Sequence, residues 1–342
     1  MCTRKIFCTL LIGLCAIAQE PKEIESATMK ILWQKRLPSG KANKLVVRDS
    51  VAYISRRQSS GEFSIDFYSL FKGNLLGKFA PVFGDRANAI TFTVDSNHDF
   101  IILYNDRVQL EGRNGFTPRS RLIIFSAQQN EAVKVWHDVE GTGTLVDCNG
   151  ATPVLGFMSF VKDSVQYFIK YGDGKNILLY TRQIKTPGRL RSIYLAIGRA
   201  PWLFTIIDDQ CALDVWDLNS SSQFQQIPLS HCNNKPYSKE EIALLSPMSA
   251  SVVQYDPLPP IVENIFSEFD GRKLVIYKPR PGSEKLTIER LPIISNSIPS
   301  KFTIELGSHS QIIGSSYWNG FLYLLLWNSR DKTEQLCLVT LA

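Results

Sequence analysis

Short runs of β-forming residues recur along this chain in pairs, and a turn separates the two runs of each pair. Six such pairs can be traced; the first joins residues 51–55 to residues 63–70, both rich in valine, isoleucine, tyrosine and phenylalanine. Runs of this composition bounded by turn residues are typical of β-strands. The second run leads through a glycine-containing turn into a further apolar run. Each repeat is therefore expected to form a small antiparallel sheet.

Repetition of such units predicts how the sheets are arranged. A small sheet buries its two faces when it packs between neighbours, so the repeat favours a radial array, a β-propeller. The fourth unit, residues 189–218, is short, and the fifth, residues 222–277, is long, so seven blades remain the alternative to six. We predict an all-β, single β-propeller with six blades. The outermost strands are expected to end near Leu70, Ser126, Arg182, Leu218, Tyr277 and Leu341.

Helical signal is confined to residues 238–245, where Ser238 is followed three residues later by Glu241. This spacing resembles a capping box, so we expect a single helical turn there. The proline-rich stretches, residues 257–260 and 279–281, lie between predicted strands and are interpreted as blade loops. Because nothing along the chain resembles an interdomain linker, residues 29–342 are assigned to one propeller domain.

The N-terminus has the pattern of a secretory signal peptide. Arg4 and Lys5 precede an apolar stretch that ends in the small-x-small sequence Ala16-Ile17-Ala18. We predict a signal peptide at residues 1–18, followed by a flexible polar lead-in at residues 19–28. The apolar stretch is shorter than the roughly 20 residues of a membrane-spanning helix. The chain is therefore expected to be secreted, or to reside in the lumen of the secretory pathway, without a membrane span.

Cysteine content fits an oxidising compartment. Removal of the leader leaves four cysteines, which could form two disulfides in three connectivities. Cys211 and Cys232 flank one connection between strands and are the preferred pair, whereas Cys337 lies in an apolar run typical of a buried thiol. The four disulfide candidates are Cys148, Cys211, Cys232 and Cys337.

Charge excludes one class of partner and suggests a surface for another. The net charge of +6 falls to +4 when Arg4 and Lys5 leave with the signal peptide, which is too small an excess to favour nucleic acid. The densest basic segment is either a solvated loop or a surface for an acidic partner. Its residues are Arg107, Arg113, Arg119 and Arg121.

Two further residues are candidates for recognition or modification. Trp318 lies within residues 315–320, a segment read as a loop, where it is either an exposed binding aromatic or part of the core. Asn219 begins the sequence Asn-Ser-Ser after a predicted strand and is a potential N-glycosylation site.

Catalytic motifs are sparse. The chain lacks the Gly-x-Ser-x-Gly nucleophile elbow, and neighbours such as Ser308 and His309 would point to opposite faces of a strand. We therefore assign no catalytic residue, no metal site and no cofactor. The alternative is a propeller hydrolase that holds calcium in its central channel, for which carboxylates and amides at strand ends would be the ligands. The candidates would be Asp95, Asn97, Asp147, Asn149, Asp208, Asp209 and Glu263.

Residues 30–34, 44–54 and 64–79 resemble one repeat of the pyrroloquinoline-quinone-type propellers: an apolar strand, an aromatic-ended strand and a glycine turn. Residues 121–136 and 212–218 are similar, and the Trp216-Asp217 step resembles that of WD repeats. The resemblance implies a propeller, and most members of this wider superfamily are interaction platforms. Residues 201–203 and 226–229 are similar to a lumenal propeller of the endoplasmic-reticulum membrane insertion complex, which implies an assembly role.

These observations together predict a secreted, non-enzymatic binding module. The expected partner is a protein or a glycan, held by loops on a rigid, monomeric scaffold. Two alternatives remain: a secreted calcium-dependent propeller hydrolase, and a lumenal or periplasmic assembly factor.

Overall fold

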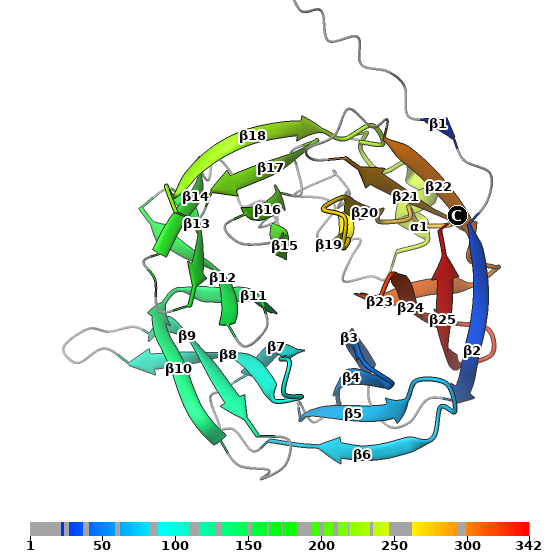
Figure 1. Cartoon of the computed structure of the whole chain (residues 1–342), viewed down its shortest axis with the longest axis horizontal. Coiled ribbons are helices and arrows are strands. Elements are labelled where there is room, and N and C mark those ends of the chain that lie inside the picture. Colours follow the sequence, from blue (N-terminus) through cyan, green and yellow to red (C-terminus); the bar gives the residue numbers. More distant parts are fainter. Residues whose placement is uncertain are drawn as a thin grey trace, which may run out of the picture.

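The computed structural model shows a closed ring of six antiparallel sheets, which confirms the all-β fold and the six-bladed count (Figure 1). The structure describes residues 22–23, 27–36, 41–58, 62–81, 88–109, 116–126, 132–149, 152–162, 164–172, 174, 176–183, 193–197, 202–207, 211–217, 219–232, 235–245, 262–292 and 299–341. The predicted signal peptide lies outside these ranges. Among the described residues no helix is long and apolar enough to cross a membrane.

Blades 1 to 3 each consist of four strands in chain order, from the centre of the ring to its rim. Blade 1 comprises β3 (Lys41–Arg48), β4 (Val51–Arg57), β5 (Phe63–Ser69) and β6 (Leu75–Phe79). Blade 2 comprises β7 (Asn88–Val94), β8 (Phe100–Gln109), β9 (Phe116–Phe125) and β10 (Ala132–Glu140). Blade 3 comprises β11 (Thr142–Asn149), β12 (Thr152–Val161), β13 (Ser164–Tyr171) and β14 (Asn176–Gln183).

Blades 4 and 5 follow the same order, and blade 5 gains a fifth strand at its rim. Blade 4 comprises β15 (Ile193–Ile197), β16 (Trp202–Ile207), β17 (Ala212–Asp217) and β18 (Ser222–Pro228). Blade 5 comprises β19 (Val262–Ser267), β20 (Lys273–Tyr277), β21 (Lys285–Leu291) and β22 (Ser300–Glu305). The added strand is β1 (Lys22–Glu23), which belongs to the predicted lead-in and pairs in parallel with β22.

Blade 6 closes the ring with strands from both ends of the chain (Figure 1). Its inner three strands are β23 (Ser310–Trp318), β24 (Phe321–Asn328) and β25 (Thr333–Thr340). Its rim strand is β2 (Thr28–Arg36), which pairs antiparallel with β25 from Thr28 opposite Thr340 to Arg36 opposite Thr333. The first blade-forming strand is thus held by the last one.

Most of the predicted ends of the outermost strands were wrong, although the number of blades was right. Tyr277 ends a second strand, Arg182 lies in a rim strand, and the third strand of a blade is followed by each of Leu70, Ser126 and Leu341. Leu218 lies outside the described residues. The reason is exposure: Ser222–Gln226 of rim strand β18 are all exposed, so this strand has no apolar alternation to detect. The third strands, which are sandwiched between neighbours, carry the clear pattern.

The core lies between adjacent blades. Second strands such as β20, where all five residues are buried, carry apolar side chains on both faces because a blade packs on each side. Burial of one large aliphatic or aromatic side chain stabilises a fold by about 1.5–3 kcal/mol, so these seams supply most of the stability. Blades 5 and 6, for example, share a cluster that includes Leu274, Phe302 and Leu324.

The connection between blades 4 and 5 contains the helical turn that the sequence predicted. Helix α1 (Lys239–Ala243) begins at Ser238, whose hydroxyl accepts a hydrogen bond from the Glu241 backbone N–H at 3.2 Å. The Glu241 carboxylate accepts from the Ser238 backbone N–H at 2.7 Å, which completes the capping box. Arg280 of blade 5 donates to the same carboxylate at 2.6 Å, which ties α1 to the propeller.

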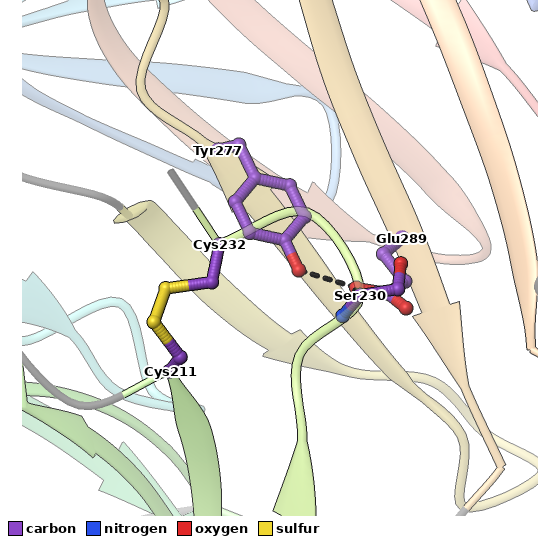
Figure 2. The surroundings of a disulfide bond; sticks show 5 residues. All are labelled: Cys211, Ser230, Cys232, Tyr277 and Glu289. Atoms are coloured by element: carbon purple, nitrogen blue, oxygen red, sulfur yellow. Dashed lines mark hydrogen bonds between the residues drawn. A yellow bond between two sulfur atoms is a disulfide. The ribbon is translucent and has the colours of Figure 1, made fainter. Parts of the chain in front are cut away.

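Cys211 and Cys232 form a disulfide, the pair that the sequence favoured (Figure 2). Their Cα atoms are 5.3 Å apart, and the bond links the start of β17 to the segment that leaves blade 4. Cys148 and Cys337, the other two disulfide candidates, are free thiols. They lie in β11 and β25 respectively, and Cys337 is fully buried, as its apolar neighbours predicted.

Candidate functional site

The turns that follow the inner strands converge at one end of the central channel. We call the described turns of blades 5, 6, 1 and 2 the inner-turn face; they comprise residues 268–272, 319–320, 49–50 and 95–99, with the strand ends that flank them. Side-chain contacts connect each of these turns to the next around the ring. The face is therefore one continuous surface over four blades.

Trp318, the predicted recognition residue, lies at the junction of blades 6 and 1. It ends β23, is partly buried, and stacks against the Arg48 guanidinium, which is 4.9 Å from the ring centroid. Its indole N–H is buried and has no hydrogen-bond partner among the described residues. Phe321, on the other side of the same turn, is 42% exposed. The tryptophan is thus not a free loop residue: it packs against the core between blades 6 and 1 and lies opposite the exposed Phe321.

The turn of blade 5 presents the most exposed large apolar side chain among the described residues, Phe269, which is 87% accessible to solvent. Ion pairs hold this turn: Arg272 contacts Asp270 at 2.6 Å, and Arg290 contacts Glu268 at 3.0 Å. The Tyr317 hydroxyl of blade 6 donates to Glu268 at 3.4 Å. Because its neighbours are fixed, Phe269 is presented to solvent on a rigid base.

Tyr317 itself is not a candidate acid or base at neutral pH. Burial, with a further contribution from the Glu268 charge, raises the pKa of its phenol to about 12. The hydroxyl therefore remains a hydrogen-bond donor that joins blades 5 and 6.

Blades 1 and 2 are joined by a chain of three polar side chains. The His98 Nε2 atom lies 2.9 Å from the Asp49 carboxylate, and the Tyr53 hydroxyl lies 2.8 Å from His98 Nδ1. Burial and the Asp49 charge raise the pKa of Tyr53 to about 12, so this phenol stays protonated and donates. We therefore assign Nδ1 as the acceptor and Nε2–H as the donor to Asp49. The arrangement resembles a catalytic relay, but its terminal hydroxyl is a poor nucleophile.

Inside the channel, the inner strands of blades 1 and 3 bring a lysine and an aspartate into electrostatic contact. The Lys44 ammonium donates to the Val146 carbonyl oxygen at 3.2 Å and so reaches from blade 1 to blade 3. Burial lowers the pKa of Lys44, and the Asp147 charge offsets part of that effect. Burial likewise raises the pKa of Asp147, with Lys44 opposing it. Each group thus compensates the other's desolvation.

Cys148, next to Asp147, is an inert thiol. Burial and the Asp147 charge raise its pKa to about 12, and its sulfur lies 3.4 Å from the Val94 carbonyl oxygen, to which it donates. A thiol becomes a nucleophile or a metal ligand through its thiolate form, which this environment disfavours.

The oxygen ligands considered for calcium are engaged in separate contacts. One Asp95 carboxylate oxygen accepts from the backbone N–H groups of Asn97 and Asp99 at 2.8 and 3.0 Å. Glu263 pairs with Lys278 at 3.6 Å, and the Lys44 charge acts on Asp147. Within the described ranges, no group of three or more His, Cys, Asp or Glu side chains is placed to hold a metal. Asp208, Asp209 and the Asn149 side chain lie outside the described parts.

The arginine segment and Trp318 belong to different ends of the molecule. Arg107 lies near the end of β8, and Arg119 and Arg121 lie near the start of β9, at the hairpin end remote from the β7–β8 turn. Arg121 approaches Asp106 at 4.0 Å. Arg113 lies outside the described residues. Figure 1 shows this hairpin projecting outward from the ring, so it forms a separate surface from the inner-turn face.

Asn219 occupies an exposed turn between β17 and β18. Its backbone N–H donates to the Asp217 carboxylate at 2.9 Å, which fixes the turn and leaves the side chain accessible. The position meets the steric requirement for an attached glycan.

Sequence reasoning missed most of the inner-turn face. Phe269, Phe321, Arg48, Asp49 and His98 come from four blades, and they lie on one surface only when the blades are placed around the ring. A usable signal was present in part, because Asp270-Gly271 is a turn-favouring pair and an aromatic residue directly before such a pair is unusual for a solvated hairpin.

Comparisons with known proteins support the fold alone. No family model and no curated protein matches this chain. Among solved structures, a putative exported protein from Bacteroides fragilis matches with a TM-score of 0.52 and 8% identity over 94% of this chain and 99% of that one. A luciferin-regenerating enzyme matches with a TM-score of 0.50 and 9% identity over 92% and 95% of the two chains. At these identities the likeness establishes a β-propeller and does not confirm the pyrroloquinoline-quinone-type resemblance.

Proposed function

We propose that this propeller is a non-enzymatic binding module that holds a protein partner on its inner-turn face. The observation that carries the proposal is the presentation of Phe269 and Phe321 to solvent at 87% and 42% exposure, on turns that buried or paired side chains brace. Exposed aromatics on a preorganised base are the usual anchors of protein interfaces, because little entropy is lost when they bind.

The test is cross-linked co-purification of the tagged chain from medium and membrane fractions, followed by mass spectrometry. The double variant Phe269→Ala, Phe321→Ala is expected to lose at least tenfold of the captured partner, without a change in thermal unfolding. Phe224→Ala is the matched control, since Phe224 is 67% exposed but lies on the rim strand β18. Retention of the partner by the double variant would reject this face, and recovery of a glycan in place of a protein would reassign the ligand class.

Entry into the secretory pathway and glycosylation belong to the same proposal. The Cys211–Cys232 disulfide supports an oxidising compartment, because such bonds persist mainly in secreted and lumenal proteins. We propose cleavage after residue 18 and N-glycosylation of Asn219 in a eukaryotic host. N-terminal sequencing of the mature chain, and a glycosidase-sensitive mass shift that Asn219→Gln removes, test the two statements.

The alternatives make distinct predictions. A calcium-dependent hydrolase predicts that millimolar calcium raises the melting temperature and that Asp147→Asn removes the shift. An assembly factor predicts a stoichiometric partner in the membrane fraction alone. If the arginine segment binds an acidic partner, capture of that partner should fall when Arg119 and Arg121 are replaced together by glutamine.

A further inference from the structure

The rim strands differ in whether another strand can pair with them. Rim strands are the edges of their sheets, and proteins protect such edges with bulges, charges or covering segments. Five of the six rim strands contain a shift of register against the third strand of their blade: β2, β6, β10, β14 and β18. A bulge bends the strand and interrupts the regular row of N–H and C=O groups that an added strand needs.

β22, the rim strand of blade 5, has no such shift. It pairs with β21 in unbroken register, from Ser300 opposite Arg290 to Glu305 opposite Lys285. It is also the one rim strand that carries an added strand in the described chain, since β1 pairs with it in parallel. The regular edge and the added strand are independent observations, and both identify β22 as competent for pairing.

β1 uses only part of this edge. Two residue pairs hold it within the described ranges, Lys22 opposite Ser300 and Glu23 opposite Lys301, whereas β22 is six residues long. A longer extended segment would form more main-chain hydrogen bonds along the same edge. Because every additional main-chain hydrogen bond adds to affinity, such a segment would compete with β1.

The register also defines a charge preference. Lys301 lies opposite Glu289 of β21 on one side, and Glu23 lies opposite it in β1 on the other. Opposite charges directly across a strand pair are favourable, and like charges are unfavourable. An added strand with an acidic residue at this position therefore fits better than one with a basic residue.

We propose that the edge of β22 is a second binding surface, which takes an extended segment of a protein partner as a parallel strand in place of β1, with an acidic residue opposite Lys301. This mode is β-augmentation, in which main-chain pairing supplies affinity and side chains supply selectivity. It is independent of the inner-turn face, because β22 lies at the rim of blade 5 (Figure 1).

The test uses a labelled synthetic peptide with the sequence of residues 19–28 as the probe and the full mature chain as the receptor, with binding measured by fluorescence anisotropy. Glu23→Pro in the receptor should weaken β1, because proline lacks the backbone donor, and should tighten probe binding at least tenfold. Lys301→Glu should weaken binding at least fivefold. A probe with lysine at the position of Glu23 should restore it, which a folding defect would not do.

Lys78→Glu is the matched control, because Lys78 lies on the bulged rim strand β6. It should leave probe binding unchanged. The proposal is overturned if the probe does not bind the Glu23→Pro receptor or if Lys301→Glu has no effect. A dimer of the Glu23→Pro receptor in light scattering without probe would also overturn it, because the edge would then pair with a second copy.

Discussion

Two seams of the ring bury charged side chains in opposite ways. Between blades 6 and 1, the Arg56 guanidinium makes two hydrogen bonds of 2.7 Å to Glu334 and a third of 2.7 Å to Asp66. Arg56 and Glu334 are each 1% exposed, so this ion pair forms out of contact with solvent. Burial alone would lower the pKa of Arg56, but Glu334 outweighs this effect and raises it.

Between blades 4 and 5, the buried charges make their hydrogen bonds to neutral groups. Glu289 is 1% exposed and accepts hydrogen bonds from the Tyr277 hydroxyl and the Ser230 backbone N–H (Figure 2). Lys273, also 1% exposed, donates to the Gly271 carbonyl at 2.9 Å and lies 4.0 Å from the centroid of the Phe204 ring. The disulfide tethers the segment that carries Ser230. We infer that the first seam is stabilised by paired charges, whereas the second tolerates its charges and is reinforced covalently.

The largest effect is expected for Arg56→Met, which tests whether paired charges stabilise the seam between blades 6 and 1. This variant removes the only cation hydrogen-bonded to Asp66 and Glu334 among the described residues, and loss of one partner from a buried ion pair costs about 3–5 kcal/mol. Urea unfolding monitored by circular dichroism should show that loss. Adding Glu334→Leu should recover part of it, and a loss below about 1 kcal/mol in the single variant would contradict paired-charge stabilisation.

Removal of the disulfide tests whether the seam between blades 4 and 5 is reinforced covalently. Cys211→Ser together with Cys232→Ser opens a loop with a sequence separation of 21 residues. A bond that closes a loop of this size contributes about 3 kcal/mol, mainly by restricting the unfolded chain. Thermal unfolding with and without reductant measures the effect. The double variant should be insensitive to reductant; if it remains sensitive, the stabilisation comes from another source.

Lys273→Met tests whether the buried charge of Lys273 stabilises the fold or is only tolerated by it. Burial lowers the pKa of Lys273 to about 8, against 10.5 for an unperturbed lysine. A lowered folded-state pKa means that stability is lost as pH falls through about 8, and gained as pH rises from 8 to 10.5, by about 3 kcal/mol in total. The methionine variant should lack this rise and should be more stable than the parent at pH 7. Parallel pH profiles of urea unfolding would contradict the assignment.

The smallest effect is expected for Glu289→Gln. The glutamine oxygen can still accept from Tyr277 and Ser230, so the expected cost is about 1 kcal/mol, the value of a weakened hydrogen bond. Glu334→Gln, which leaves the Arg56 charge without its bidentate partner, should cost at least twice as much. Equal losses in urea unfolding would show that the two seams do not differ in kind.

The fold was predictable because it depends on local signals that repeat. Alternation in strands such as β3 and β13, and the capping box at Ser238, are properties of short segments. The Cys211–Cys232 pairing followed from their positions on one strand connection. Rim strands were not predicted because their side chains are largely exposed, and exposed side chains do not have to alternate between apolar and polar residues.

The inner-turn face and the buried charges were not predictable on these grounds. Arg56 and Glu334 are separated by 278 residues in sequence, and nothing near either residue indicates that it is buried. Phe269 and Trp318 meet on one surface because blades 5 and 6 are neighbours in space. Contacts between blades therefore cannot be predicted until the arrangement of the blades in the ring is known.

The closure of blade 6 by β2 has a consequence for biosynthesis. β2 is synthesised long before its partner β25, which is completed only at residue 340. Until then one β-strand has no sheet, and blade 1 lacks Glu334 for Arg56. Sequence-distant pairing of this kind slows folding and prolongs exposure of unpaired strands. The chain should therefore depend on chaperones until β25 is released, and truncations that remove β25 should be degraded even when five blades are intact.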